Sequence, residues 1–412
     1  MKSILILFTL AGAAFAQNGF QIKPNDTIVF YGDSITDQRQ YTVLTETFIV
    51  TRFPHYNVRF VHSGWGGDRV SGGGGGPVQE RVKRDVTPYK PTVVTIMLGM
   101  NDGAYRAFNE DIFKTYSTGF EKLVGLIKEG SPGVRLTYIQ PSPYDDVTRA
   151  PNFPMGYNYV LVRYGAFLKE YAARSGAQVA DLNTNVVDML KQANTTDPEN
   201  AKKIVPDRVH PGWGGHLIMA EELLKAWGAP KAVTTVEIDA AAGRVITAEN
   251  TTIVDLKGTS WRQKDAALPM PLPEKTVPVL LAVKSSDFVE ALNQQILKVS
   301  GLKAGRYNLK INGTAIANFS NADLAKGVNL AEYPTPMMKQ AEEVHAFTLK
   351  RSNVHNLRWR QLQTPMEKEN YAQLAVVMAN LDALDEEIAV RQRAAAKPAE
   401  CLYELVMLTE PK

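Results

Sequence analysis

The amino-acid sequence predicts an α/β fold: a doubly wound, flavodoxin-like parallel sheet of five strands, followed by a smaller region of mixed strands and helices. One observation supports the sheet, and a second marks where it ends. Short, nearly continuous apolar runs alternate with longer helical segments through the first half of the chain. Such runs indicate strands buried on both faces, which requires helices above and below a parallel sheet. This alternation ends after Gly228-Ala-Pro230, where the pattern changes.

Each expected strand of the sheet is short and apolar, and the first three end in small or polar residues. The five strands are Thr27–Tyr31, Val58–Val61, Thr92–Leu98, Arg135–Ile139 and the weaker Gln178–Leu182. The first leads into Gly32-Asp33-Ser34, the second into Gly64 to Gly67 and the third into Gly99-Met-Asn101-Asp102. Helices are expected at 41–52, 111–128, 159–174 and 215–227. Functional side chains of such folds gather at the carboxyl ends of the strands.

The residues after Pro230 predict short strands with turn signals between them. These are Val233–Ile238, Val245–Thr247 and Thr252–Leu256, followed by a proline-rich loop between Pro269 and Pro278. A hairpin is expected over Tyr307–Ile311 and Ala315–Phe319, because the intervening Asn312-Gly313 favours a type I′ turn.

The chain is expected to be helical from Pro336, with a break near Thr364-Pro365. The second of these helices, about Glu367 to Ala396, is amphipathic. Its Leu/Val/Met stripe is interpreted as packing, with a recognition surface as the alternative.

Length and the N-terminal residues divide the chain further. With 412 residues it is longer than one compact domain usually needs. Lys2, the apolar run Ile4–Ala11 and the Ala14-Phe15-Ala16 site are typical of a signal peptide over residues 1–16, with a buried N-terminal helix as the alternative. We therefore expect a catalytic domain at 17–230, a C-terminal region of unknown role at 231–412, and a periplasmic or extracellular protein.

Composition excludes several classes of function. The 46 basic and 43 acidic residues leave a net charge of +3, which gives no electrostatic footprint for nucleic acid or anionic membranes. No later segment is long and apolar enough to predict an integral membrane span. Cys401 is the only cysteine, so neither an intramolecular disulfide nor a thiolate metal site can form.

Ser34 is the candidate nucleophile. It follows the first strand directly and precedes a helix, so its backbone N–H lies near a helix start and can donate to an oxyanion. The alternative role is a helix N-cap, which serine often fills.

Asp207-Arg-Val-His210 supplies a candidate base and its orienting acid. An Asp three residues before a His can fold back onto one ring nitrogen, leaving the other nitrogen to face the nucleophile. A capping Asp beside an incidental surface His is the alternative.

Two further strand ends offer oxyanion donors. The Asn101 amide can point into the crevice, and Gly67 can present its N–H without a Cβ in the way. Both residue types are also common in turns. The turn interpretation does not explain why four strand or loop ends carry the four functions of a serine hydrolase.

These blocks resemble the SGNH (GDSL-like) hydrolases, which are named for a Ser, a Gly, an Asn and a His in four blocks. The matching segments are Tyr31-Gly-Asp-Ser-Ile-Thr36, Ser63-Gly-Trp-Gly-Gly-Asp68, Gly99-Met-Asn-Asp102 and Asp207-Arg-Val-His-Pro211. The resemblance covers about Asp26 to Trp227. It departs at His62, where many members carry Asn, which affects a supporting hydrogen bond rather than Gly67 itself.

The resemblance implies a serine esterase with Ser34, Asp207 and His210 as its triad and with Ser34, Gly67 and Asn101 as oxyanion donors. It implies no metal or organic cofactor. The expected substrate is an acylated small molecule or carbohydrate, with a short, above all acetyl, ester. A lysophospholipase or lipase-like esterase, a glycan-binding protein with a vestigial site, and an acyltransferase remain alternatives. The sequence does not reveal the oligomeric state.

Other features near the blocks have two interpretations each. Gly72–Gly76 is a flexible rim or a solvated turn, and is no phosphate loop because no Gly-Lys-Ser/Thr follows. Trp65 and Trp213 flank the site and form either a substrate wall or part of the core. His216 is expected to be structural, since no other residues of suitable spacing would complete a metal site.

Overall fold

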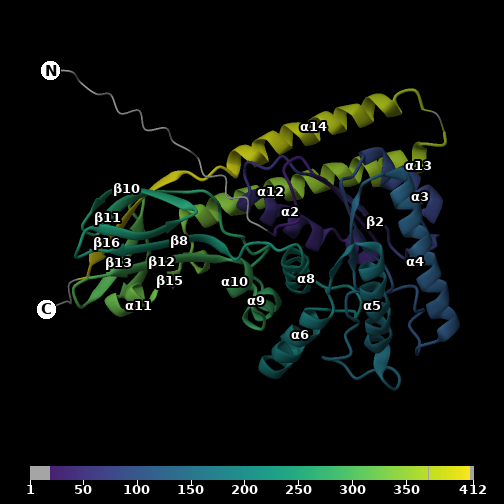
Figure 1. The fold of residues 1–412 in the computed structure, drawn as a ribbon, viewed down its shortest axis with the longest axis horizontal. Helices are drawn as coiled ribbons and strands as arrows, with labels where there is room; N and C mark the ends of the chain where they lie inside the picture. The colour runs from purple at the N-terminus through teal and green to yellow at the C-terminus, as the bar shows by residue number, and fades with distance from the viewer. Residues whose placement is uncertain (1–18, 370, 409–412) are drawn as a thin grey trace.

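The computed structural model describes residues 19–369 and 371–408. The predicted signal peptide, residues 1–16, lies outside the described residues. The described chain builds a parallel sheet with flanking helices, two further large sheets, a two-stranded sheet, and a pair of long helices that run back across the first unit (Figure 1).

The first sheet is parallel throughout and has the order β2-β1-β5-β6-β7. Its strands are β1 (Thr27–Gly32), β2 (Arg59–Gly64), β5 (Val93–Met97), β6 (Arg135–Ile139) and β7 (Gln178–Ala180). Counted among themselves, these strands lie in the flavodoxin-like order 2-1-3-4-5, so the predicted fold class is confirmed. The central strands are buried along nearly their whole length, which explains their continuous apolar sequences.

The four expected helices are present as α2 (Gln40–Arg52), α4 (Glu110–Gly130), α5 (Gly156–Ser175) and α8 (Trp213–Ala226). The structure adds α1 (Ser34–Asp37), α3 (Val78–Asp85), α6 (Thr184–Thr196) and α7 (Pro198–Ala201), which the sequence analysis did not identify. Helix α4 begins where Asn109 caps it, accepting from the Ile112 N–H at 3.0 Å.

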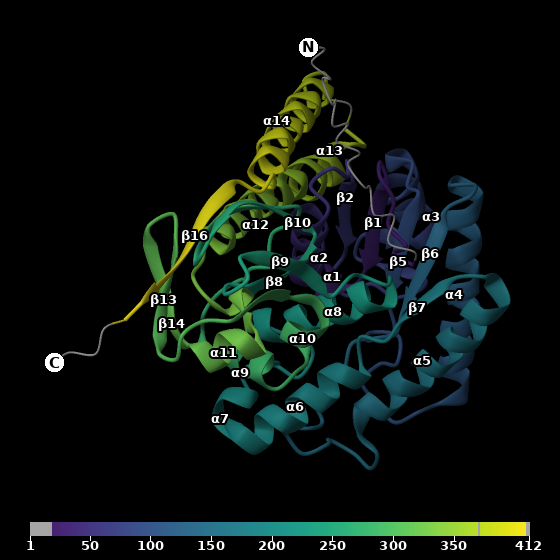
Figure 2. The same cartoon turned by 60° about the vertical axis from the view of Figure 1, so that its left-hand side comes forward.

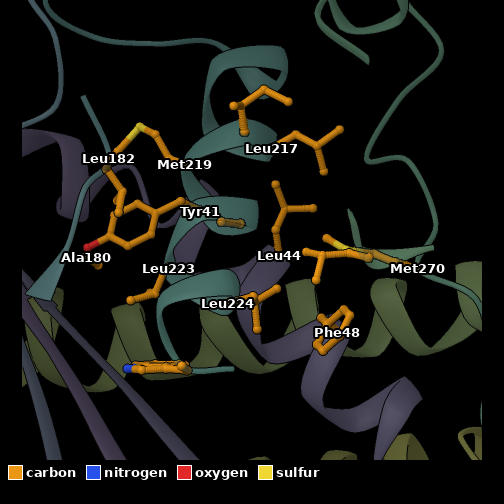
Figure 3. Packing of buried hydrophobic residues seen from close by; sticks show 14 of the residues in the cluster. Tyr41, Leu44, Phe48, Ala180, Leu182, Leu217, Met219, Leu223, Leu224 and Met270 are labelled. Atoms are coloured by element: carbon orange, nitrogen blue, oxygen red, sulfur yellow. The ribbon is translucent and has the colours of Figure 1, made fainter. Parts of the chain in front are cut away.

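Helices α2 and α8 pack together over the sheet. Buried side chains from both helices, from the end of β7 and from the later Met270 meet in one apolar layer (Figure 3). The Leu268 N–H also donates to the Thr51 carbonyl at 3.0 Å. The proline-rich loop of the C-terminal region therefore closes this layer.

The C-terminal region contains two larger sheets. One has the order β10-β11-β16-β13-β14, with β10 (Thr251–Lys257), β11 (Ser260–Asp265), β16 (Glu400–Met407), β13 (Arg306–Ile311) and β14 (Thr314–Ser320). The other has the order β15-β12-β8-β9, with β15 (Val328–Asn329), β12 (Gln294–Ser300), β8 (Ala232–Asp239) and β9 (Arg244–Glu249). Short helices α9 (Val277–Lys284), α10 (Phe288–Leu292) and α11 (Asn321–Lys326) connect them.

The expected strands in this region are confirmed, and the hairpin turn has positive φ at both Asn312 and Gly313, as a type I′ turn requires. Strands β11, β12 and β16 were not predicted. Each alternates buried and partly or fully exposed residues, so polar side chains interrupt the apolar pattern.

Two long helices follow the sheets. Helix α12 (Pro336–Asn356) continues through a π-helical segment, η3 (Leu357–Gln363), into α13 (Thr364–Met366), and α14 (Leu374–Ala395) runs back alongside α12 (Figure 2). The break expected near Thr364-Pro365 is present a few residues later, between α13 and α14, and the helix changes to π-helical form just before Pro365. We call residues 336–395 the helical hairpin.

Polar contacts attach the helical hairpin to α2. Arg351 Nη1 lies 2.9 Å from Glu46 Oε1, and His345 Nδ1 lies 2.9 Å from Thr47 Oγ1, all buried. The Leu/Val/Met stripe of α14 is only partly covered: Leu374, Met378, Leu381 and Ile388 are half-buried, whereas Val376, Val377, Leu384 and Val390 are exposed. Its interpretation as packing therefore remains a prediction. Within the described ranges, no helix is both long and apolar enough to cross a bilayer.

Candidate active site

Ser34 begins the short helix α1, immediately after β1. The Asp33 carboxylate accepts from the Ile35 N–H at 3.0 Å, so Asp33 and not Ser34 is the N-cap. Gly32 is required here, since a Cβ would lie 2.2 Å from Thr36 Oγ1 and 2.8 Å from the Met97 carbonyl oxygen. The turn therefore leaves the Ser34 hydroxyl free for another partner.

That partner is His210, which lies in the loop before α8. His210 Nε2 is 2.8 Å from Ser34 Oγ, and His210 Nδ1 is 2.6 Å from Asp207 Oδ2. The second Asp207 oxygen accepts from the N–H groups of Val209 and His210, at 3.0 and 2.7 Å. The structure thus brings together the three residues that the sequence predicts for a triad.

The hydrogen bonds of Asp207 and His210 determine which atoms of the triad carry protons. Partial burial raises the pKa of Asp207, but the hydrogen bonds from His210 and Val209 outweigh it and hold the pKa below its ordinary value. A carboxylate only accepts, so Nδ1 of His210 carries the proton and Nε2 can accept from the Ser34 hydroxyl. Asp207 and His210 are exposed at the surface of the site, with 55% and 36% of their side-chain area accessible.

The expected oxyanion donors lie on neighbouring loops. A Cβ placed on Gly66 would be 4.0 Å from Ser34 Cβ, which puts the Gly66-Gly67 loop beside the nucleophile. Gly67 has a φ of +79°, in the left-handed region, and within the described ranges its N–H has no acceptor. The Ser34 N–H starts a helix and has no acceptor within it.

Asn101 is fixed to the same loop. Its Nδ2 donates to the Asp68 carbonyl at 3.0 Å, and the Tyr105 hydroxyl donates to its Oδ1 at 3.1 Å. The amide nitrogen keeps a second N–H for another acceptor. Two contacts therefore orient Asn101 without using all its donor capacity.

A buried ionic chain supports this loop, and the sequence analysis missed it. Arg81 of α3 is fully buried and contacts Asp68 at 2.7 Å, Asp85, and the Ser63 carbonyl at 2.8 Å. The Trp359 indole N–H of η3 donates to Asp85 at 2.6 Å. The only sequence signal was the position of Asp68 directly after Gly67.

Two acids next to site residues are shielded from water, Asp33 fully and Asp102 in part. Burial raises the pKa of Asp33 to about 7, against the hydrogen bond from Ile35. Burial likewise raises the pKa of Asp102 to about 7, although the Val70 N–H donates to it at 3.0 Å. Both lie next to site residues in sequence, Asp33 before Ser34 and Asp102 after Asn101.

The glycine run is partly packed and partly exposed: Gly72 and Gly75 are buried, whereas Gly73 and Gly74 are exposed. Gly72–Gly73 and Gly76–Pro77 pair as the short strands β3 and β4. A Cβ on Gly75 would lie 2.6 Å from the ring of Trp65, which is itself buried. The glycines therefore allow the backbone to approach Trp65 closely.

The remaining predicted positions lie as follows. Trp213 is half-buried at the start of α8, with its ring edge-on to His345. His216 is buried, accepts from the Tyr41 N–H at 3.3 Å and contacts Gln38 Oε1 at 3.1 Å, which fits its structural role. His62 bonds Thr42 at 2.7 Å, so it serves the α2 interface and not the oxyanion loop.

One acidic group has the spacing of metal ligands: Glu221, Glu222 and Asp287. Lys225 already supplies a cation there, with its Nζ 2.8 Å from Glu222 and 3.3 Å from Asp287. None of these residues contacts the triad in the described structure. That the reaction needs no cofactor remains a prediction.

The chain is similar to known hydrolases in sequence and to a solved enzyme structure in fold. Residues 30–218 match the model of the GDSL-like Lipase/Acylhydrolase family. An acetylxylan esterase of Geobacillus stearothermophilus is 26% identical over 233 residues, covering 50% of this chain and 96% of that protein. The solved structure of a gut microbial diltiazem-metabolizing enzyme is 26% identical, with a TM-score of 0.79, covering 94% of this chain and 98% of that one. The second likeness therefore includes most of the C-terminal region.

Proposed function

We propose that this chain, whose residues 30–218 form a GDSL-like lipase/acylhydrolase domain acting on ester bonds, removes acetyl groups from acylated carbohydrates through an acyl-Ser34 intermediate. The observation that carries the proposal is the hydrogen-bonded chain Ser34–His210–Asp207, with contacts of 2.8 and 2.6 Å. The similarity to an acetylxylan esterase supports the choice of acyl group and alcohol.

In the first half-reaction His210 Nε2 takes the proton of Ser34 as Oγ bonds to the carbonyl carbon. The N–H groups of Ser34 and Gly67 and the Asn101 amide hold the negative oxygen. When the tetrahedral centre collapses, the bond to the alcohol oxygen breaks and His210 returns the proton to it. Asp207 stabilises the imidazolium throughout and stays a carboxylate.

In the second half-reaction His210 takes a proton from water as the water oxygen attacks the acyl carbon. Collapse breaks the bond to Oγ, Ser34 recovers its proton from His210, and the carboxylic acid leaves. The exposure of Asp207 and the partial exposure of His210 are consistent with an open site that a bulky saccharide can reach.

An aryl ester series with acyl chains of two to twelve carbons tests the acyl preference. A long acyl chain gains roughly 0.8 kcal/mol for each CH₂ it buries, and the four sequence blocks contain no long apolar run that would supply such a surface. We expect kcat/KM to be highest for acetyl or propionyl esters and to fall by octanoyl. A steady rise with chain length would overturn this proposal in favour of a lipase-like enzyme.

Export from the cytoplasm is part of the proposal, and it rests only on Lys2, the apolar run Ile4–Ala11 and the Ala14-Phe15-Ala16 site. Determination of the N-terminal residue of the protein after expression with its full leader tests it. An N-terminus at Gln17 is expected, and a retained Met1 in the released protein would contradict processing.

A further inference from the structure

The η3 segment of the helical hairpin approaches the oxyanion loop through Trp65. The ring of Trp359 lies edge-on to the Trp65 ring, with centroids 5.9 Å apart, and the Arg360 guanidinium lies over the Trp65 ring. Trp65 precedes Gly67 by two residues, a span of at most about 7 Å of extended chain. A residue late in the sequence therefore lies close to the proposed oxyanion donors.

Three guanidinium groups surround Trp65, and two of them already have acidic partners. Arg81 pairs with Asp68 and Asp85. Arg84 pairs with Asp85 at 2.6 Å and with Glu367 at 3.7 Å.

Arg360 is the remaining cation. Within the described ranges no carboxylate lies within 4.0 Å of its guanidinium. Asp37 is the acid that attracts Arg360 most, and it does so from beyond that distance. Arg360 therefore keeps donors that another anion could use.

Arg360 lines a cavity of about 410 Å³ together with Trp65, the glycine loop and Pro365. The charged residues of the cavity otherwise pair among themselves, Arg84 with Glu367 and Lys368 with Glu80 at 4.0 Å. The cavity is thus lined by the Trp65 ring, by glycine backbone and by the Arg360 guanidinium, which has no ion-pair partner in the described ranges.

We propose that this cavity binds a carboxylate on the alcohol part of the ester, so that the preferred substrates are acetyl esters of acidic saccharides. The planar guanidinium of Arg360 matches a carboxylate with two parallel N–H donors, and Trp65 holds that plane in place. This proposal rests on the proposed esterase function and names its substrate class.

The test compares an O-acetylated methyl glucuronoside with the matching O-acetylated methyl glucoside, using the full chain. We expect kcat/KM of the wild type to favour the acidic ester by roughly tenfold, the scale of one charge-assisted contact at a partly exposed site. In Arg360→Gln this ratio should fall to about one. High salt should reduce the wild-type ratio, because exposed charges are screened.

Arg358→Gln is the matched control. It removes the same charge from the same segment, but Arg358 pairs with Asp382 at 2.6 Å and does not line the cavity. The preference ratio should stay at its wild-type value in this variant. An equal fall of the preference ratio in both variants would mean that Arg360 only packs on Trp65, which would overturn the proposal.

A measurement on the wild type keeps the proposal testable if Arg360→Gln does not fold. Methyl glucuronoside should inhibit aryl acetate hydrolysis at roughly tenfold lower concentration than methyl glucoside. Equal inhibition, or equal turnover of the two acetylated glycosides, would overturn the carboxylate site while leaving the esterase intact. No hydrolysis of any acetyl ester would instead overturn the proposed function.

Discussion

The catalytic unit and the C-terminal region of this protein are built on opposite plans. In the first, five parallel strands are buried on both faces, and Ser34, Gly67 and Asn101 lie just beyond the carboxyl ends of three of them. In the second, sheets of mostly antiparallel strands expose part of their residues, and the last strand, β16, lies between β11 and β13. In the first unit these site residues lie at the strand ends. The second region contacts that unit near the oxyanion loop through the helical hairpin.

A chain of polar contacts links the helical hairpin to Asn101. Trp359 donates to Asp85, Asp85 contacts Arg81, and Arg81 contacts Asp68, whose carbonyl accepts from Asn101. Every link is a hydrogen bond or ion pair, and all but the last are buried. The triad therefore belongs to the first region, whereas the orientation of the oxyanion loop depends on contacts from both regions.

The largest effect is expected from Ser34→Ala. If the chemistry belongs to the first region, loss of the nucleophile should lower kcat for an aryl acetate by about 10⁴-fold or more, because triad members act as a unit. The fold should persist, as circular dichroism can verify. Near-normal turnover by a folded variant would contradict the role of Ser34 as the nucleophile.

Asn101→Ala should cost less. Removal of one oxyanion donor lowers kcat by about 10²–10³, while the N–H groups of Ser34 and Gly67 remain. The loss should fall on kcat and not on KM, since the bond strengthens in the transition state. A change confined to KM would reassign Asn101 to substrate binding.

Trp359→Phe tests the contribution of the second region. It keeps a buried ring but removes the donor to Asp85, a bond to a charged group worth about 1.5–3 kcal/mol, of which only part is felt at Asn101. We expect kcat to fall by roughly tenfold at an almost constant KM.

The matched control for that variant is Trp261→Phe, which removes an indole donor from β11, where Nε1 bonds Gln263 at 3.1 Å. It should destabilise the protein without changing kcat of the folded fraction. Equal losses of kcat in the two variants would mean that the hairpin affects activity only through stability.

The smallest effect concerns the pH dependence of the interface between the two regions. Burial lowers the pKa of His345 to about 4, although Glu46 opposes the shift. The folded state therefore binds fewer protons than the unfolded chain between the ordinary pKa near 6.5 and pH 4. The stability that neutral His345 contributes is present above about pH 6.5 and is lost as the pH falls through this window.

His345→Gln should reduce the slope of the free energy of unfolding against pH by at most about 1.4 kcal/mol per pH unit. Urea unfolding at pH 7, 6 and 5 measures this slope. Gln keeps a partner for Thr47 Oγ1. The exposed His55 provides the control, and His55→Gln should follow the wild-type slope. An unchanged slope in His345→Gln would contradict a neutral buried imidazole at this interface.

The sequence was enough for the fold class and for the triad because both depend on local patterns. Buried parallel strands have continuous apolar runs, and an Asp three residues before a His can meet it within one loop. The parallel order then brings the carboxyl ends of the strands to one edge, so Ser34 and His210 meet although 176 residues separate them.

Only the tertiary structure decided how the C-terminal region contributes. Strand β16 and segment η3 take their places through partners that are far away in the sequence, so no local period reveals them. Arg81 likewise looks like a surface residue of a charged helix until Asp68, Asp85 and Trp359 enclose it. Burial of a charge is a property of what packs around it, and the packing here is set by long-range contacts that the one-dimensional pattern does not encode.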